Sequence, residues 1–222
     1  MAAFNLPGLT GDMSVMPLVC VEAPIVKVSA DLKAIQAAPR NDGIWEFSEV
    51  ELDFERLFHR VPPLGGAHLS KLMLWEPENK EGRTAILSNH IDAHQRTMLR
   101  LNEDFGHQSF RIVISDNYEY FPECRFEFLS AEGRCRMVEV FNDDKWEFRT
   151  EGMPESFEDP KNYTQRRKRA RLTPEIVIGY LKKIGWDLTE EAFWRSNRRA
   201  LLAEQISWSK GPVTILDFFP NG

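Results

Sequence analysis

The 222-residue chain has few cysteines and no long apolar run. No uncharged apolar stretch approaches the roughly 18 residues that a membrane-spanning helix needs. A secretory signal has a basic segment followed by an apolar run, and the first 16 residues lack this pattern. Cys20, Cys124 and Cys135 include no Cys-x-x-Cys pair, which favours core thiols in a reducing compartment over disulfides. We therefore expect a cytoplasmic protein that has no membrane segment.

Common catalytic motifs are also missing. The chain contains no Gly-x-Ser-x-Gly elbow, no glycine-rich phosphate-binding loop and no dinucleotide-binding fingerprint. Isolated pairs such as Ser88 beside His90 occur by chance in a chain of this length, so they do not indicate a nucleophile and its base. We expect neither a catalytic residue nor a cofactor.

What the chain does have is the composition of a soluble globular protein, with 42% hydrophobic and 28% charged residues. The hydrophobic pattern on either side of the proline- and glycine-rich loop at residues 62–66 is incomplete without the other half. We therefore predict one domain over residues 1–222. Residues 1–16 carry Pro7, Gly8 and Gly11, and we expect them to be mobile.

The most regular pattern in the chain runs from residue 108 to residue 149. Between Tyr118 and Leu129, apolar residues alternate with charged ones, which is the two-residue period of a half-buried strand. The apolar positions are Tyr120, Cys124, Phe126 and Phe128, and the charged ones are Glu119, Glu123, Arg125 and Glu127. Turns at residues 131–133, where Gly133 can take a positive φ, and at residues 142–145 reverse the chain. The pattern predicts a central meander of three antiparallel strands.

The side chains also predict a register for this meander. We expect Leu129 to pair with Arg134. Glu127 then lies opposite Arg136 on the solvent side. Glu139 falls opposite an apolar position, a misfit that predicts a bulge or a strand end. The shared apolar face would hold Phe126, Met137, Phe141, Trp146 and Phe148.

Shorter patterns complete the fold prediction. Strands are expected at residues 18–28 with a break at Pro24, and at residues 44–50, 72–75, 84–87 and 213–219. Helices are expected at residues 29–39 and 92–105, and after the capping residues Asp159, Thr173 and Thr189, the last helix reaching Ile206. Strands before and helices after, rather than strict alternation, predict an α+β fold whose mainly antiparallel sheet packs against C-terminal helices.

Charge suggests a protein partner. The formal net charge is −6, and acidic surfaces steer and orient basic partners. We expect a non-enzymatic module that binds a basic protein surface, such as a bacterial inhibitor or immunity-type protein that masks the active site of a toxin. The expected contact residues are Glu119, Glu123, Glu127, Asp143 and Asp144. The same carboxylates also fit a solvated strand face and a turn.

A pair of histidines gives a first alternative, a metal-assisted hydrolase. His90 and His94 would share one face of a helix, with His107 or Glu103 as a third donor. However, Ile91 stands where the corresponding helix of zinc hydrolases has its glutamate. We therefore predict no metal site.

A basic segment gives a second alternative, a nucleic-acid-associated factor. Residues 160–172 contain six basic residues and no acidic one, a local charge of +6 in a chain of net charge −6. The candidate anion-binding residues are Arg166, Arg167, Lys168, Arg169 and Arg171. A structural interpretation stays open as well, in which these side chains pair with the acidic residues 151–159 or with the glutamate-rich sheet face.

Overall fold

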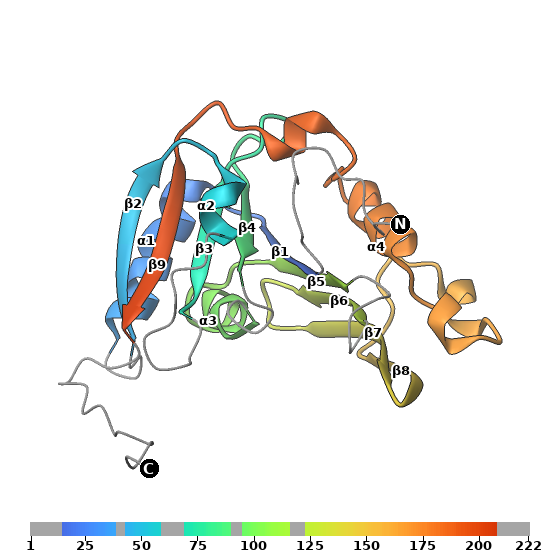
Figure 1. Cartoon of the computed structure of the whole chain (residues 1–222). Helices are drawn as coiled ribbons and strands as arrows, with labels where there is room; N and C mark the ends of the chain where they lie inside the picture. The colour runs from blue at the N-terminus through green and yellow to red at the C-terminus, as the bar shows by residue number, and fades with distance from the viewer. Residues whose placement is uncertain (1–14, 39–42, 59–68, 90–94, 116–122, 208–222) are drawn as a thin grey trace, which may run out of the picture.

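The computed structural model of the chain describes residues 15–38, 43–58, 69–89, 95–115 and 123–207 (Figure 1). These residues form a nine-stranded antiparallel sheet with the strand order β2-β9-β3-β4-β1-β5-β6-β7-β8. The strands are β1 (Val15–Val21), β2 (Ile44–Val50), β3 (Lys71–Trp75), β4 (Thr84–Ser88), β5 (Ser109–Ser115), β6 (Glu123–Leu129), β7 (Cys135–Asp143), β8 (Lys145–Glu151) and β9 (Ala200–Ser207). The predicted α+β class with a mainly antiparallel sheet is confirmed.

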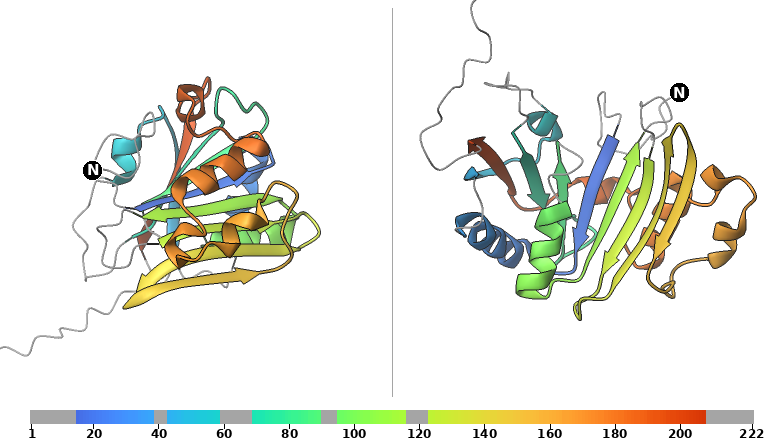
Figure 2. Two further views of the ribbon diagram at one scale, coloured as in Figure 1. Left: turned by 90° about the vertical axis from the view of Figure 1, so that its right-hand side faces the viewer. Right: turned by 90° about the horizontal axis from the view of Figure 1, so that it is seen from below.

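Helices lie on both faces of the sheet (Figure 2), and each face carries an apolar cluster. Helices α1 (Ile25–Ala37) and α3 (Gln95–Phe105) pack on one face. The other face carries helices α2 (Phe54–Phe58) and α4 (Pro174–Lys183) and the short 3-10 helices η1 (Pro160–Thr164), η2 (Lys168–Ala170) and η3 (Glu191–Trp194). On that face Phe126 of β6 meets Phe157 and Tyr180 with ring centroids 5.5 Å and 6.2 Å apart. The predicted packing of the meander against the C-terminal segment is therefore confirmed.

The meander is present, but the segment contains four strands, β5 to β8, rather than three, and its predicted register is wrong by one residue. Leu129 pairs with Cys135 rather than with Arg134. The reason lies in the turn, because the Ser130 N–H donates to the Arg134 carbonyl at 2.9 Å and adds a pair that the prediction omitted. Gly133 has a φ of 80°, as predicted. The shift places Val138 and Val140, instead of Met137 and Phe141, in the core beside Phe126 and Phe148.

Helix α1 begins earlier than the sequence predicts. The predicted strand 18–28 ends at Val21, and the helix starts at Ile25 rather than at Ser29. The backbone N–H groups of Lys27 and Val28 both donate to the Pro24 carbonyl at 3.0 Å. Pro24 therefore marks the start of a helix rather than a break in a strand, since proline suits a helix entry.

The predicted helix that continues to Ile206 is wrong. After η3 the chain becomes strand β9, which lies between β2 and β3. Leu201 joins the core on the α1 side and Leu202 the core on the α2 side. A strand covered on both faces has a continuous apolar run, which periodicity alone cannot distinguish from a buried helix. Because β9 pairs with β2 and β3, the chain before and after residues 62–66 shares one sheet.

Several local predictions are confirmed. Strands occur at residues 44–50, 72–75 and 84–87. Helix α3 ends at Phe105, as predicted, directly before Gly106, which has a φ of 69°. Leu99 of this helix is 37% exposed. The loop at 62–66, the strand at 213–219 and residues 1–14 of the predicted mobile segment 1–16 lie outside the described residues, whereas Val15 and Met16 belong to β1.

Candidate functional site

Charged side chains of β5, β6, β7 and β8 form a row of ion pairs across one face of the sheet, which we call the charge ladder. Its members are Arg111, Glu123, Arg125, Glu127, Glu139 and Arg149. Arg111 contacts its register partner Glu127 at 2.8 Å. Arg125 likewise contacts its register partner Glu139 at 2.7 Å, so the misfit expected at Glu139 does not occur. Three arginines thus compensate three glutamates within the sheet.

The charge ladder changes the interpretation of the predicted acidic row. Glu127 was expected on a solvated face, and this is wrong, because Glu127 is only 5% exposed beside Arg111. Glu123 is half-buried and contacts Arg125 at 2.7 Å. Burial raises the pKa of Glu123 despite the lowering effect of Arg125. Glu119 lies outside the described residues. Partner binding by these residues stays a prediction, but two of the carboxylates already have internal counter-charges.

Asp143 and Asp144 lie at the tight turn between β7 and β8. Both side chains are exposed, and Asp144 has a φ of 61°, a left-handed conformation that aspartate tolerates better than most residues. Among the predicted partner-binding residues in the described ranges, Asp143 and Asp144 are the exposed ones, whereas Glu123 is half-buried and Glu127 is buried.

The histidine pair considered for a metal site, His90 and His94, lies outside the described residues. His107, the candidate third donor, is buried, and its Nε2 atom lies 2.6 Å from Asp31 Oδ2. Burial would raise the pKa of Asp31, but hydrogen bonds from Lys27 and His107 lower it instead. Within the described ranges, no three His, Cys, Asp or Glu side chains gather closely enough to hold a metal ion.

A buried ion pair anchors the segment between β8 and α4 on the sheet. Arg136 of β7 donates to Glu158 from Nε at 2.9 Å and from Nη2 at 2.8 Å. The Tyr163 hydroxyl donates to the same carboxylate at 2.5 Å, and the Glu155 N–H at 2.8 Å. Burial would raise the pKa of Glu158, but the hydrogen bonds from Arg136 and Tyr163 lower it. The chain that leads into the basic segment is therefore fixed against β7.

Capping residues and a ring contact fix the basic segment itself. The Asp159 carboxylate accepts from the Lys161 N–H at 3.1 Å, and the Thr173 hydroxyl accepts from the Ile176 N–H at 3.4 Å. These contacts confirm two of the three predicted caps, although Asp159 begins a 3-10 helix and not a longer helix. The third predicted cap, Thr189, is wrong, because Glu190 stands at the N-cap of η3 and makes no side-chain capping bond. Between them, Arg171 lies over the Phe148 ring at 5.1 Å. The segment is thereby held across β8.

The basic segment and β8 enclose a hollow of about 350 Å³, which we call the basic hollow. It is lined by Trp146, Arg167, Lys168 and Arg169. Lys168 contacts Glu147 of β8 at 2.9 Å, which agrees with the structural interpretation of the segment for this one side chain. Arg166, Arg167 and Arg169 are exposed, and they form no ion pair with any residue in the described ranges. Most of the basic charge is therefore not compensated locally.

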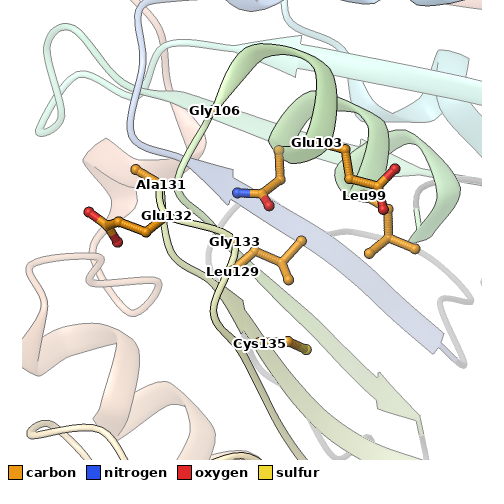
Figure 3. A pocket seen from close by; sticks show the side chains of 9 residues that line it. Leu99, Glu103, Gly106, Leu129, Ala131, Glu132, Gly133 and Cys135 are labelled. Carbon is orange, nitrogen blue, oxygen red and sulfur yellow. The ribbon is translucent and has the colours of Figure 1, made fainter.

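A second hollow, of about 470 Å³, lies between the end of α3 and the turn that joins β6 to β7 (Figure 3). We call it the acidic hollow. Leu99 and Leu129 contribute apolar surface, and the exposed Glu103 and Glu132 contribute carboxylates from the helix and from the turn. A hydrogen bond from the Ser130 side chain lowers the pKa of Glu132.

Cys135 also lines the acidic hollow. The sequence interpretation of this residue as a core thiol is wrong, because Cys135 is exposed, whereas Cys20 and Cys124 are buried as expected. Partial burial still raises the pKa of the Cys135 thiol, which disfavours the reactive thiolate. The absence of a disulfide between Cys124 and Cys135 is confirmed.

No family model, curated protein or solved structure matches this chain. None of the helices in the described ranges is long and apolar enough to cross a membrane. We therefore infer the ligand class of this chain from the geometry of the two hollows.

Sequence reasoning did not identify the part that Trp146 plays in the basic hollow. It assigned Trp146 to the apolar face of the meander, and this is confirmed, since the side chain packs partly against the core. What the pattern did not show is that η2 returns to β8 and leaves Trp146 beside the arginines. The acidic hollow was missed for a similar reason, because its residues come from elements that are distant in the sequence.

Proposed function

We propose that this chain is a binding module that recognises an anionic ligand through the basic hollow. The observation that carries this proposal is the group of three exposed arginines, Arg166, Arg167 and Arg169, which pair with no acidic residue in the described ranges, in a chain of net charge −6. Like charges held together repel one another, and this repulsion disfavours the folded state. A bound anion would relieve the repulsion.

Arginine is well suited to such a ligand. Its planar guanidinium donates two parallel hydrogen bonds to a phosphate or carboxylate, and charge-assisted bonds of this kind are about twice as strong as neutral ones. The scaffold supports the site as well, because Glu158 anchors the segment on one side and Arg171 on the other. Binding would then order little additional backbone, which favours affinity.

Neutralising two arginines of the basic hollow tests the proposal. The wild-type chain is expected to bind a labelled polyanion, such as a heparin fragment or an oligonucleotide, with an affinity that falls as salt rises. Arg167→Gln/Arg169→Gln should weaken binding and reduce the slope of log K against log salt by about 1.4, or about 0.7 for each lost contact to a single strand. Fluorescence anisotropy at several salt concentrations measures both quantities.

A matched variant separates the basic hollow from net charge. Arg56→Gln/Arg96→Gln removes the same charge from exposed positions on α2 and α3. We expect this variant to keep most of the wild-type affinity. Equal losses in both double variants, or no binding of any polyanion at low salt, would contradict the proposal.

The acidic hollow favours a second candidate function, the binding of a basic protein partner. An arginine or lysine side chain could pack its aliphatic stem on Leu99 and Leu129 and place its charge between Glu103 and Glu132. The exposed Asp143 and Asp144 would extend the acidic surface at a separate turn. An inhibitor that masks a basic surface would then use these exposed carboxylates more than Glu123 and Glu127, which already pair with arginines of the sheet.

Charge neutralisation at the acidic hollow tests this second function. Glu103→Gln/Glu132→Gln should weaken binding of an Arg-Leu repeat peptide by roughly 2- to 30-fold, the range that two exposed ion pairs support. Glu55→Gln/Glu81→Gln, at exposed positions elsewhere, is the control and should change little. Calorimetric titration gives the two affinities, and a peptide that binds all three proteins equally would rule out the acidic hollow as its site.

A further inference from the structure

The tryptophans of the described core differ from Trp146 in how their indole N–H groups are used. Trp75 donates to the Phe193 carbonyl at 2.8 Å, Trp186 to Glu22 Oε1 at 2.7 Å, and Trp194 to the Leu188 carbonyl at 2.8 Å. Buried tryptophans ordinarily satisfy this donor. Trp146 is half-buried, and its N–H donates to no residue in the described ranges. Part of the ring therefore faces solvent in the basic hollow.

The Trp146 ring is also free of the ring contacts that its neighbour makes. Phe148, two residues further along β8 on the same face, meets Tyr163 at 5.7 Å and Arg171 at 5.1 Å. Trp146 makes no aromatic or cation–π contact with the part of the chain that the structure describes, although Arg167 and Arg169 line the same hollow. Tryptophan is the best cation–π acceptor among the side chains, so the exposed part of this ring beside two arginines is a surface on which a ligand can pack.

The geometry points to a ligand that carries both a planar ring and phosphates, and we propose that the basic hollow binds single-stranded nucleic acid. This inference depends on the proposed anion-binding function. One unpaired base would stack on Trp146, and Arg167 and Arg169 would contact the adjacent phosphates. Aromatic platforms flanked by basic side chains are the usual means of binding single strands without sequence preference. A base can stack on this ring only when it is not paired and stacked within a duplex, which favours a single strand.

Comparison of three ligands and two variants tests the inference. The ligands are a labelled oligothymidylate, an abasic oligonucleotide of the same length and a heparin fragment. Of the three ligands, we expect the oligothymidylate to bind with the highest affinity. Trp146→Leu should weaken its binding roughly 5- to 100-fold, which is the effect of losing one stacked base. The same substitution should leave abasic DNA and heparin nearly unaffected.

The control variant is Trp45→Leu. Trp45 is also half-buried, but it lies on β2, at the opposite edge of the sheet from β8. It should retain wild-type affinity for all three ligands, and near-ultraviolet circular dichroism should show a folded core in both variants. Stacking on Trp146 should also quench tryptophan fluorescence in the wild type and in Trp45→Leu but not in Trp146→Leu.

The outcomes separate the inference from the function on which it depends. If the three ligands bind equally and Trp146→Leu binds like the wild type, the hollow recognises charge alone, and the base-stacking inference is wrong while the proposed function stands. If a mononucleotide displaces the oligothymidylate at equal phosphate concentration, the ligand is a free nucleotide, which also overturns the inference. If no ligand binds at low salt, both fail.

Discussion

Replacing Glu158 by glutamine is expected to lower the free energy of unfolding by about 3–5 kcal/mol. Glutamine keeps the shape of the side chain but removes the charge. The Arg136 side chain is only 3% exposed, so its guanidinium would lose its counter-charge in a site that water does not reach. Its bonds to the Glu151 and Gly152 carbonyls, at 2.9 Å and 3.0 Å, remain but do not neutralise it. Urea unfolding followed by circular dichroism measures the loss.

An exposed ion pair provides the control for Glu158→Gln. Glu191 contacts Arg195 across one turn, and both side chains are more than half exposed. Glu191→Gln should therefore change the unfolding free energy by about 0–1 kcal/mol. A loss at Glu158→Gln no larger than this would show that the buried pair does not stabilise the fold.

The same carboxylate predicts a pH dependence. The pKa of Glu158 lies below its ordinary value of 4.5, so the folded chain binds fewer protons at this group than the unfolded chain does. Its contribution is complete above pH 4.5 and is lost as the pH falls through the lowered pKa. The difference in unfolding free energy between the wild type and Glu158→Gln should accordingly shrink below pH 4.5. An unchanged difference would contradict the ionised pair.

Glu127→Gln gives the second large effect, a loss of ~3 kcal/mol in unfolding free energy. Arg111 is 1% exposed, and its Nη1 atom lies 2.8 Å from Glu127. Neutralising Glu127 removes the negative charge that contacts the buried Arg111 guanidinium. The loss should be at the low end of the range for buried pairs, because Glu123 and Glu139 still compensate the adjacent Arg125. A shift of the denaturation midpoint at constant m-value would show it.

Glu123→Gln, on the same strand, is the matched control. Burial raises the pKa of Glu123, so folding favours its protonated form. Its contribution is present below the ordinary pKa of 4.5 and is lost as the pH rises through the raised value. At neutral pH we expect Glu123→Gln to change stability by less than about 1 kcal/mol. If it were as destabilising as Glu127→Gln, the assignment of Arg111 and Glu127 as the critical pair would be wrong.

Local chemistry explains what could be predicted from the sequence. Asp159 and Thr173 cap the elements that follow them, because a short oxygen-bearing side chain can accept from nearby backbone N–H groups whatever the rest of the fold does. Gly106 and Gly133 take positive φ for a similarly local reason. The two-residue period around Phe126 identified a strand directly, although both faces of β6 proved to be largely covered.

Two predictions failed for different reasons. The register of β7 shifted by one residue because of a local detail of the turn, the hydrogen bond from the Ser130 N–H to the Arg134 carbonyl. The apolar run at Leu201 and Leu202 became a strand because β2 and β3, which are distant in the sequence, were available on both sides of it. This second effect leaves no signal within a short window of sequence.

By itself, the amino-acid sequence determined the class of fold, the positions of most strands and the location of the basic segment. It also determined the capping roles of Asp159 and Thr173. Only the tertiary structure decided which charges are compensated. Glu127 meets Arg111 within the sheet, while Arg167 and Arg169 meet no acidic residue in the described ranges and instead share a hollow with Trp146. The physical reason is that the effect of a charge depends on the groups within a few ångströms of it and on their exposure to water, and strand pairing brings those groups together from distant parts of the chain.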